Sequence, residues 1–108
     1  MSFDAHDRVL DLLRTLSPLL PALTASDASL GDQLRRASAS TLLNIAEAAR
    51  RTLRDRRNRF RIALGSAAEV SACLEVAIAF GYFEPAQVAA ALELADRVRA
   101  MTYCLSLK

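Results

Sequence analysis

The chain has 108 residues, of which 53% are hydrophobic and 24% are charged, and its formal net charge is +2. This length corresponds to one domain that can bury a core without disulfides or metals, and this composition excludes a disordered chain. Leucine and alanine dominate, whereas glycine and proline number three each, so the composition favours helices over strands. No apolar run approaches the roughly 18 residues of a membrane span, and no secretory leader opens the chain, so we expect a cytoplasmic protein.

The first predicted helix covers residues 4–20, where apolar residues recur at helical spacing. Asp4 is its expected N-cap, because a carboxylate can accept hydrogen bonds from the first free amides. Pro18 is expected to kink the helix near its end, and Pro21 to help stop it. A linker, "TASDAS", follows.

The second predicted helix covers residues 30–53, and Ser29 with Asp32 three residues later resembles a capping box at its start. The sequence "RDRRN" (54–58) is expected to form the turn that follows. The third predicted helix covers residues 57–80, and Gly65 within it is expected to allow close approach of the second helix.

The fourth predicted helix covers residues 85–106. Gly81 suits the position after the third helix, because glycine adopts a left-handed conformation without strain. Pro85 suits the first position of the fourth helix, where its missing N–H is not needed. Four amphipathic helices joined by short turns predict an all-α, antiparallel up-and-down four-helix bundle that occupies residues 1–108 as one domain.

The third helix is apolar around nearly its whole circumference, and three partner helices in a small bundle do not cover such a surface. We therefore expect an oligomer, and a contact between two different surfaces would close it into a ring.

The charge is distributed unevenly along the chain. Residues 1–32 carry −3, residues 33–61 carry +7, and residues 62–108 carry −2. The turn predicted above divides the arginines of this central segment between the ends of two helices. Five of them have only Asp55 nearby and form the predicted nucleic-acid-binding set: Arg54, Arg56, Arg57, Arg59 and Arg61. Arginine suits bidentate contacts with phosphate, so this set predicts a grip on the RNA backbone.

A second set of polar residues lies on the second and third predicted helices. Its members are Ser40, Asn44, Glu47, Arg51, Ser66 and Glu69. Two carboxylates can serve general acid–base chemistry, but that needs a cleft and separated pKa values, for which the sequence offers no sign. We therefore expect a structural cluster, in which Arg50 or Arg51 pairs with Glu69, and no enzymatic activity.

No cofactor or metal is expected. The single histidine, His6, and the two cysteines lack the spacing of a metal site. Cys73 and Cys104 are expected to be small buried hydrophobic residues.

Two segments together resemble the four-helix-bundle proteins of 23S rRNA intervening sequences, the S23-like family: "QLRRASASTLLNIAEAARR" and "FRIALGSAAEVSACLEVAIAFGYF". The accessory protein of diversity-generating retroelements is related. Members of the family usually read NIAEG, whereas here Ala48 occupies the glycine position. The resemblance implies a homopentamer with a basic surface, RNA or reverse-transcriptase-like partners, and no reaction.

Two classes of function remain open. One is an oligomeric module that binds RNA or a ribonucleoprotein through its arginines. The other is an oligomeric protein-interaction scaffold without direct nucleic-acid contact, in which the arginines serve solubility or salt bridges between subunits.

Overall fold

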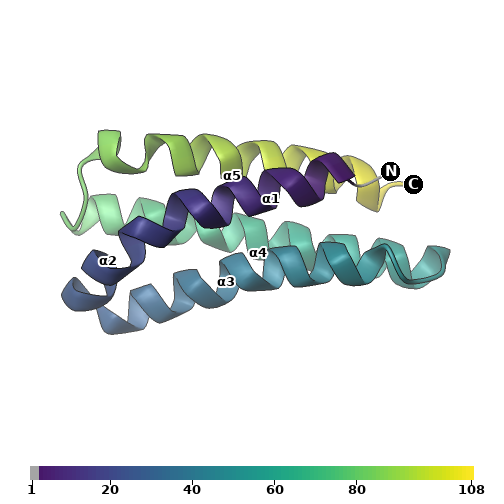
Figure 1. Ribbon diagram of the computed structural model, residues 1–108, viewed down its shortest axis with the longest axis horizontal. Coiled ribbons are helices and arrows are strands. Elements are labelled where there is room, and N and C mark those ends of the chain that lie inside the picture. The colour runs from purple at the N-terminus through teal and green to yellow at the C-terminus, as the bar shows by residue number, and fades with distance from the viewer. Residues whose placement is uncertain (1–2) are drawn as a thin grey trace.

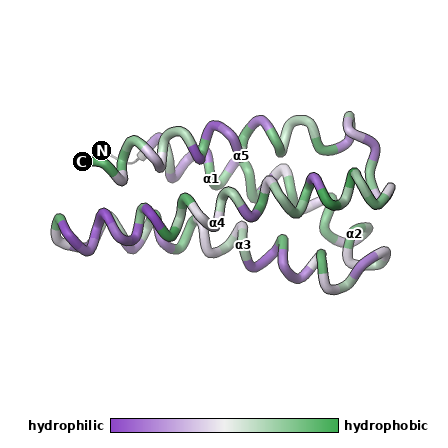
Figure 2. The backbone as a smooth tube through the Cα atoms, turned by 180° about the vertical axis from the view of Figure 1, so that it is seen from behind, coloured by the Kyte–Doolittle hydropathy of each residue, from purple (hydrophilic) through white to green (hydrophobic). Residues whose placement is uncertain are grey.

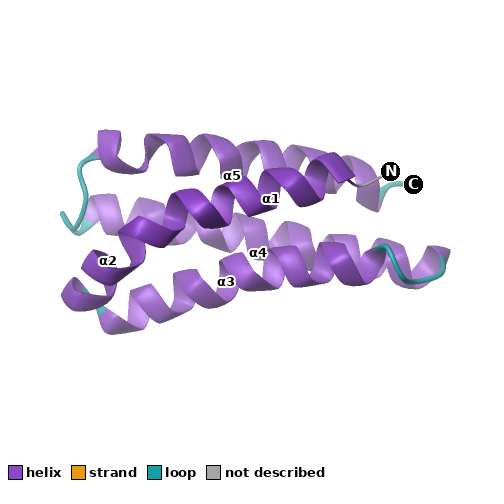
Figure 3. Cartoon of the chain, in the orientation of Figure 1, coloured by secondary structure: helices purple, strands orange, loops and turns teal. Residues whose placement is uncertain are grey.

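Four antiparallel helical arms make up residues 3–108, which are the part of the chain that the computed structural model describes (Figure 1). The bundle measures 42 × 22 × 19 Å. No strand occurs among these residues (Figure 3). The predicted all-α four-helix bundle is therefore confirmed. Both termini and the connection between the second and third arms lie at the same end of the bundle.

The first arm consists of two helices rather than one. Helix α1 (Phe3–Leu16) passes through a short 3-10 turn (Ser17–Leu19) into helix α2 (Leu20–Ser26). Pro18 lies in the 3-10 turn, where a break was expected. The prediction that Pro21 helps to stop the helix is wrong: it lies in the first turn of α2, where an amide proton is not required.

Two predicted helix caps are corrected. Asp4 lies inside the first turn of α1 and not before it. Helix α3 (Ala28–Ala48) begins after Asp27, whose carboxylate accepts a hydrogen bond of 3.0 Å from the Leu30 amide. The N-cap is thus Asp27 and not Ser29, so the predicted six-residue linker shrinks to one non-helical residue.

The connection between α3 and α4 (Leu53–Ala79) lies at residues 49–52, and the predicted turn at residues 54–58 is wrong, because those residues are helical. Thr52 has an extended backbone and precedes the helix as its N-cap. The segment 54–58 contains no glycine or proline, and arginine is a good helix former, so nothing in it prevents helix formation.

The end of α4 matches the sequence prediction. Gly81 has a φ of +79°, the left-handed region that favours glycine. The Gly81 amide donates to the Ile78 carbonyl at 3.0 Å, and the Tyr82 amide donates to the Ala77 carbonyl at 2.9 Å, which is a Schellman ending. Helix α5 (Pro85–Ser106) then opens on its proline and has the predicted bounds.

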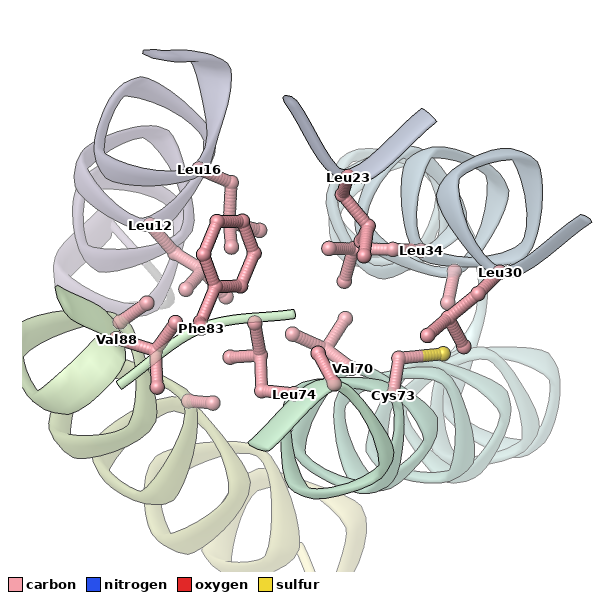
Figure 4. Packing of buried hydrophobic residues seen from close by; sticks show 14 residues of the cluster. Leu12, Leu16, Leu23, Leu30, Leu34, Val70, Cys73, Leu74, Phe83 and Val88 are labelled. Carbon is pink, nitrogen blue, oxygen red and sulfur yellow. The ribbon is translucent and has the colours of Figure 1, made fainter. Parts of the chain in front are cut away.

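Helix α4 packs most extensively against α3 and then against α5, while α1 packs against both α3 and α5. Leucines from three arms meet two valines and a phenylalanine in the core at the α2 end of the bundle (Figure 4). Its largest contributors are Leu12, Leu16, Leu23, Leu34 and Leu74. A second cluster, around Phe60 and Ile45, fills the core toward the termini.

Helix α2 approaches α3 closely at Gly31. A Cβ atom at Gly31 would lie 2.9 Å from the Cα of Thr24, so α2 crosses α3 against bare backbone. A Cβ atom at Gly65 would meet nothing within 4 Å. The predicted close approach at Gly65 is therefore wrong, and the glycine at which another helix comes close is Gly31, where α2 meets α3.

Candidate nucleic-acid interface

All five arginines of the predicted nucleic-acid-binding set lie on the first turns of α4, and are not divided between two helices. They lie at the end of the bundle that holds both termini, and Figure 2 shows the hydrophilic colour concentrated where α3 and α4 meet there. Because the helix starts at Leu53, all five side chains project from one continuous helix, although not from a single face of it.

Three of the five arginines share one face of α4. Arg54, Arg57 and Arg61 are spaced three and four residues apart, which aligns side chains on a helix. We call these three residues the arginine face. Arg54 and Arg61 are exposed, whereas Arg57 is half-buried and its Nε donates a 3.0 Å hydrogen bond to the Lys108 carbonyl oxygen. That bond fixes the arginine face beside the end of α5.

The other two arginines point elsewhere. Nη1 of Arg59 donates to Oδ1 of Asn44 on α3 at 3.2 Å, so Arg59 lies in the α3–α4 seam. Arg56 is half-buried, as Arg57 is, but it lies outside the three- and four-residue spacing that aligns the arginine face. The interface that can reach a large ligand therefore centres on the arginine face.

None of these five arginines forms an ion pair within 4 Å with an Asp or Glu side chain of residues 3–108. The six ion pairs found there use other cations: Arg8, Arg14, Arg35, Arg36, Arg51 and Arg99. The amino end of a helix carries the positive end of its dipole, so cations there are disfavoured. Asp55 is the acidic residue of the first turn. Helix stability thus does not account for the arginines at this position.

Part of the predicted polar cluster forms a hydrogen-bonded group in the α3–α4 seam. The Oγ atoms of Ser40 and Ser66 are 2.8 Å apart. Nδ2 of Asn44 donates to the carbonyl and hydroxyl oxygens of Ser40 at 2.9 and 3.1 Å. With Arg59 on the Asn44 oxygen, this chain of bonds joins the two helices at one register.

The charged members of the cluster lie apart from this group. Nε of Arg51 donates to Glu47 at 2.7 Å near the α3–α4 turn. Glu69 instead accepts a hydrogen bond of 3.2 Å from Nε2 of the Gln33 side chain. The predicted pairing of Arg50 or Arg51 with Glu69 is therefore wrong. The reason is the distance along α4: Glu69 lies sixteen residues after Leu53, about 24 Å of helix away from the turn that holds Arg50 and Arg51.

A polar groove of about 460 Å³ follows the same seam toward α2, lined by Gln33, Arg36, Ser66 and Glu69 among others.

The hydrogen bond from Arg51, and then its charge, lower the pKa of Glu47. A general acid at neutral pH needs the opposite shift. Glu47 therefore remains an ionised partner of Arg51.

A second groove, of about 710 Å³, lies between α4 and α5 and is more apolar. Arg61 of the arginine face forms part of its lining, together with Gly65 of α4 and Arg99 and Tyr103 of α5. Sequence reasoning missed Arg99 and Tyr103. Their spacing of four on α5 was a usable signal only once α5 was known to pack beside the start of α4.

The thiols differ from each other. Cys73 is buried, and burial, followed by the nearby charge of Glu69, raises its pKa. Cys104 is exposed, so the expectation that both thiols are buried is wrong for Cys104. Within residues 3–108, no three histidine, cysteine or acidic side chains are grouped closely enough to hold a metal ion.

The chain is similar to known proteins in sequence and in fold. A sequence model of the family described as 23S rRNA-intervening sequence protein matches residues 4–104. Among solved structures, a protein of unknown function from the S23 ribosomal protein family of Bacteroides thetaiotaomicron superposes with a TM-score of 0.86. The two share 22% sequence identity over 96% of this chain and 99% of that one, which shows a common fold. No curated protein matches the chain.

Proposed function

The chain belongs to the 23S rRNA-intervening sequence protein family, and from that premise we propose that it is a non-enzymatic, oligomeric bundle protein that binds RNA through the arginine face. The observation that carries the proposal is the set of five arginines at the start of α4, none of which forms an ion pair with an Asp or Glu side chain of residues 3–108. An arginine guanidinium can give two parallel hydrogen bonds to one phosphate. Such contacts hold the backbone and read little sequence.

We also propose that copies of the chain form a ring, and the family resemblance implies five subunits. In the most apolar 18-residue window of α4, only 39% is buried within one subunit. Leu43 on α3 and Ile62 and Val76 on α4 are 66%, 41% and 36% exposed. Contact with a neighbouring copy would cover this surface and repeat the arginine face around the ring.

By length and composition alone, α4 is also suited to crossing a membrane. We favour a cytoplasmic protein without membrane contact, because α4 packs between α3 and α5 in a bundle whose charged residues lie outside the core. A core helix of a soluble bundle has the same length and composition.

A protein-interaction scaffold is the second candidate function. At the end of the bundle opposite the arginines, Phe80 is 65% exposed and makes an edge-on contact with Tyr82 at 5.8 Å between ring centroids. An exposed aromatic residue suits a protein contact, for example with a reverse-transcriptase-like partner.

The test is the salt dependence of RNA binding, measured by fluorescence anisotropy from about 50 mM salt upward. Replacement of Arg54, Arg57 and Arg61 by Gln should lower the log–log slope by roughly 2 to 3, because each phosphate contact contributes about 0.7 to 0.9. The mass from native mass spectrometry should not change.

The matched control removes the same charge far from the interface. Replacement of Arg14, Arg35 and Arg36 by Gln should leave most of the slope in place, because these exposed residues lie toward the α2 end of the bundle. If the wild-type protein binds neither RNA nor DNA at about 50 mM salt, the RNA proposal is wrong and the scaffold is the better description.

A further inference from the structure

We infer that the groove between α4 and α5 holds an unpaired base of RNA, so that the interface selects single-stranded over double-helical segments. This inference rests on the proposed function and adds to it the class of RNA that is bound. It starts from the position of the groove, which continues the arginine face at Arg61.

The groove has the volume of a small-ligand site but is a shallow depression that is largely open to solvent. Its volume of about 710 Å³ falls within the range of about 300–1,000 Å³ for such sites. Gly65 contributes no side chain to the groove, and a Cβ atom there would meet no atom within 4 Å. Leu64, Ala68 and Ala100 add apolar lining. A flat, weakly polar ring can therefore enter without leaving buried protein polar groups unpaired.

Tyr103 supplies an aromatic surface in this groove. Its side chain is 53% exposed, although large apolar surfaces are usually covered. The chain has two tyrosines, and the other, Tyr82, donates its hydroxyl to Asp27 at 3.1 Å. An exposed aromatic ring beside a cationic track is the arrangement on which bases of single strands stack.

The charges around the groove favour a strand that carries phosphate. Arg61 on α4 and Arg99 on α5 line opposite helices of the groove, and Asp96 is the acidic residue between them. The Arg99–Asp96 pair is loose, with 3.4 Å between Nη1 and Oδ1 and the Asp96 side chain 72% exposed. The groove therefore keeps a net positive charge, and Arg54 and Arg57 extend it for about 10 Å along α4.

Duplex RNA offers no unstacked base that could enter this groove. A base in a double helix is already stacked on both faces, whereas bases in loops and single strands are free to stack on a protein aromatic ring. A duplex can still contact the arginine face through its phosphates. A change in Tyr103 that weakens single-strand binding and leaves duplex binding the same therefore reports on the groove.

The experiment compares a fluorescein-labelled single-stranded 12-mer with a 12-base-pair duplex RNA, using wild-type protein, Tyr103→Ala and Tyr103→Phe. Loss of base stacking should weaken single-strand binding by roughly 5- to 150-fold in Tyr103→Ala. Duplex binding should change less than about twofold, and Tyr103→Phe should behave as wild type, because phenylalanine keeps the ring.

A second readout uses the fluorescence of Tyr103 itself. The chain contains no tryptophan, so in a Tyr82→Phe background Tyr103 is the single intrinsic fluorophore. Stacking should quench its emission when the single strand is added, and the duplex should leave it unchanged.

The outcomes separate this inference from the proposed function. If Tyr103→Ala binds the single strand as tightly as wild type while replacement of the arginine face abolishes binding, the groove inference is wrong and the proposed function stands. If the wild type binds neither RNA, both are wrong. If Tyr103→Ala or Gly65→Leu lowers the oligomer mass, the groove is a contact between copies and the inference is overturned.

Discussion

Replacing Gly31 with alanine should destabilise the protein, although alanine is the better helix former. The substitution gains roughly 0.5–1 kcal/mol in helix propensity. The new Cβ would lie 2.9 Å from the Cα of Thr24, and backbone cannot rotate away as a side chain can. Overpacking costs about 1–3 kcal/mol, and contact with a backbone atom belongs in the upper part of that range, so after the gain in propensity we expect a net loss of about 1–2 kcal/mol.

Gly65→Ala is the matched control, because it makes the same change inside a helix with open space around the new Cβ. It should stabilise the protein by roughly 0.5–1 kcal/mol. For 108 residues, the entropy of unfolding at the midpoint is about 0.23 kcal/mol/K. The expected shifts in Tm are therefore a decrease of about 4–9 °C for Gly31→Ala and an increase of about 2–4 °C for Gly65→Ala.

Circular dichroism melts at equal protein concentration measure both shifts, and native mass spectrometry checks that the oligomer is the same. Adding Thr24→Ala to Gly31→Ala should recover only part of the loss, since the Thr24 Cα remains in place. A Gly31→Ala protein that melts at or above the wild-type temperature would refute the reasoning, because it would show that α2 moves aside freely.

Three further predictions concern a cap, the thiols and an ion pair. Asp27→Ala should lower the free energy of unfolding, measured with urea, by about 1–2 kcal/mol, because α3 loses its N-cap and the Tyr82 hydroxyl loses its acceptor. Ser29→Ala should change it by less than about 0.5 kcal/mol, and equal losses would contradict the assignment of the cap. With a thiol reagent at pH 8, Cys104 should react quickly, and Cys73 only upon unfolding, because it is buried and its pKa is raised; fast reaction of two thiols per native chain would show that the core opens readily. The pKa of Glu47 is lowered from 4.5 in the folded state, so its contribution to stability is present above pH 4.5 and is lost as the pH falls through the lowered value. The difference in Tm between wild type and Glu47→Gln should therefore shrink between pH 7 and pH 3. A constant difference would mean that the Glu47–Arg51 ion pair is not responsible for it.

Local signals predicted the parts of the fold that depend on a few neighbouring residues. The end of α4 and the start of α5 lie where the sequence predicted them, within one residue, because Gly81 and Pro85 each impose a backbone conformation. The α3–α4 turn was misplaced because its residues, 49–52, include no such signal, and because the arginines that follow are compatible with both helix and turn. The position of that turn decides whether the arginines are divided or lie on one helix.

The candidate site shows the same division. The sequence by itself determined which arginines are in excess of the acidic residues near them, since charge can be counted along the chain. The tertiary structure alone decided that Arg59 bonds to Asn44, while Arg61 joins Arg99 and Tyr103 around a groove. Likewise, three glycines are visible in the sequence, but only the packing shows that α2 meets α3 at Gly31. Periodicity and composition specify which residues a helix buries, whereas the partner of each side chain depends on the register and distance between helices that are far apart in the chain.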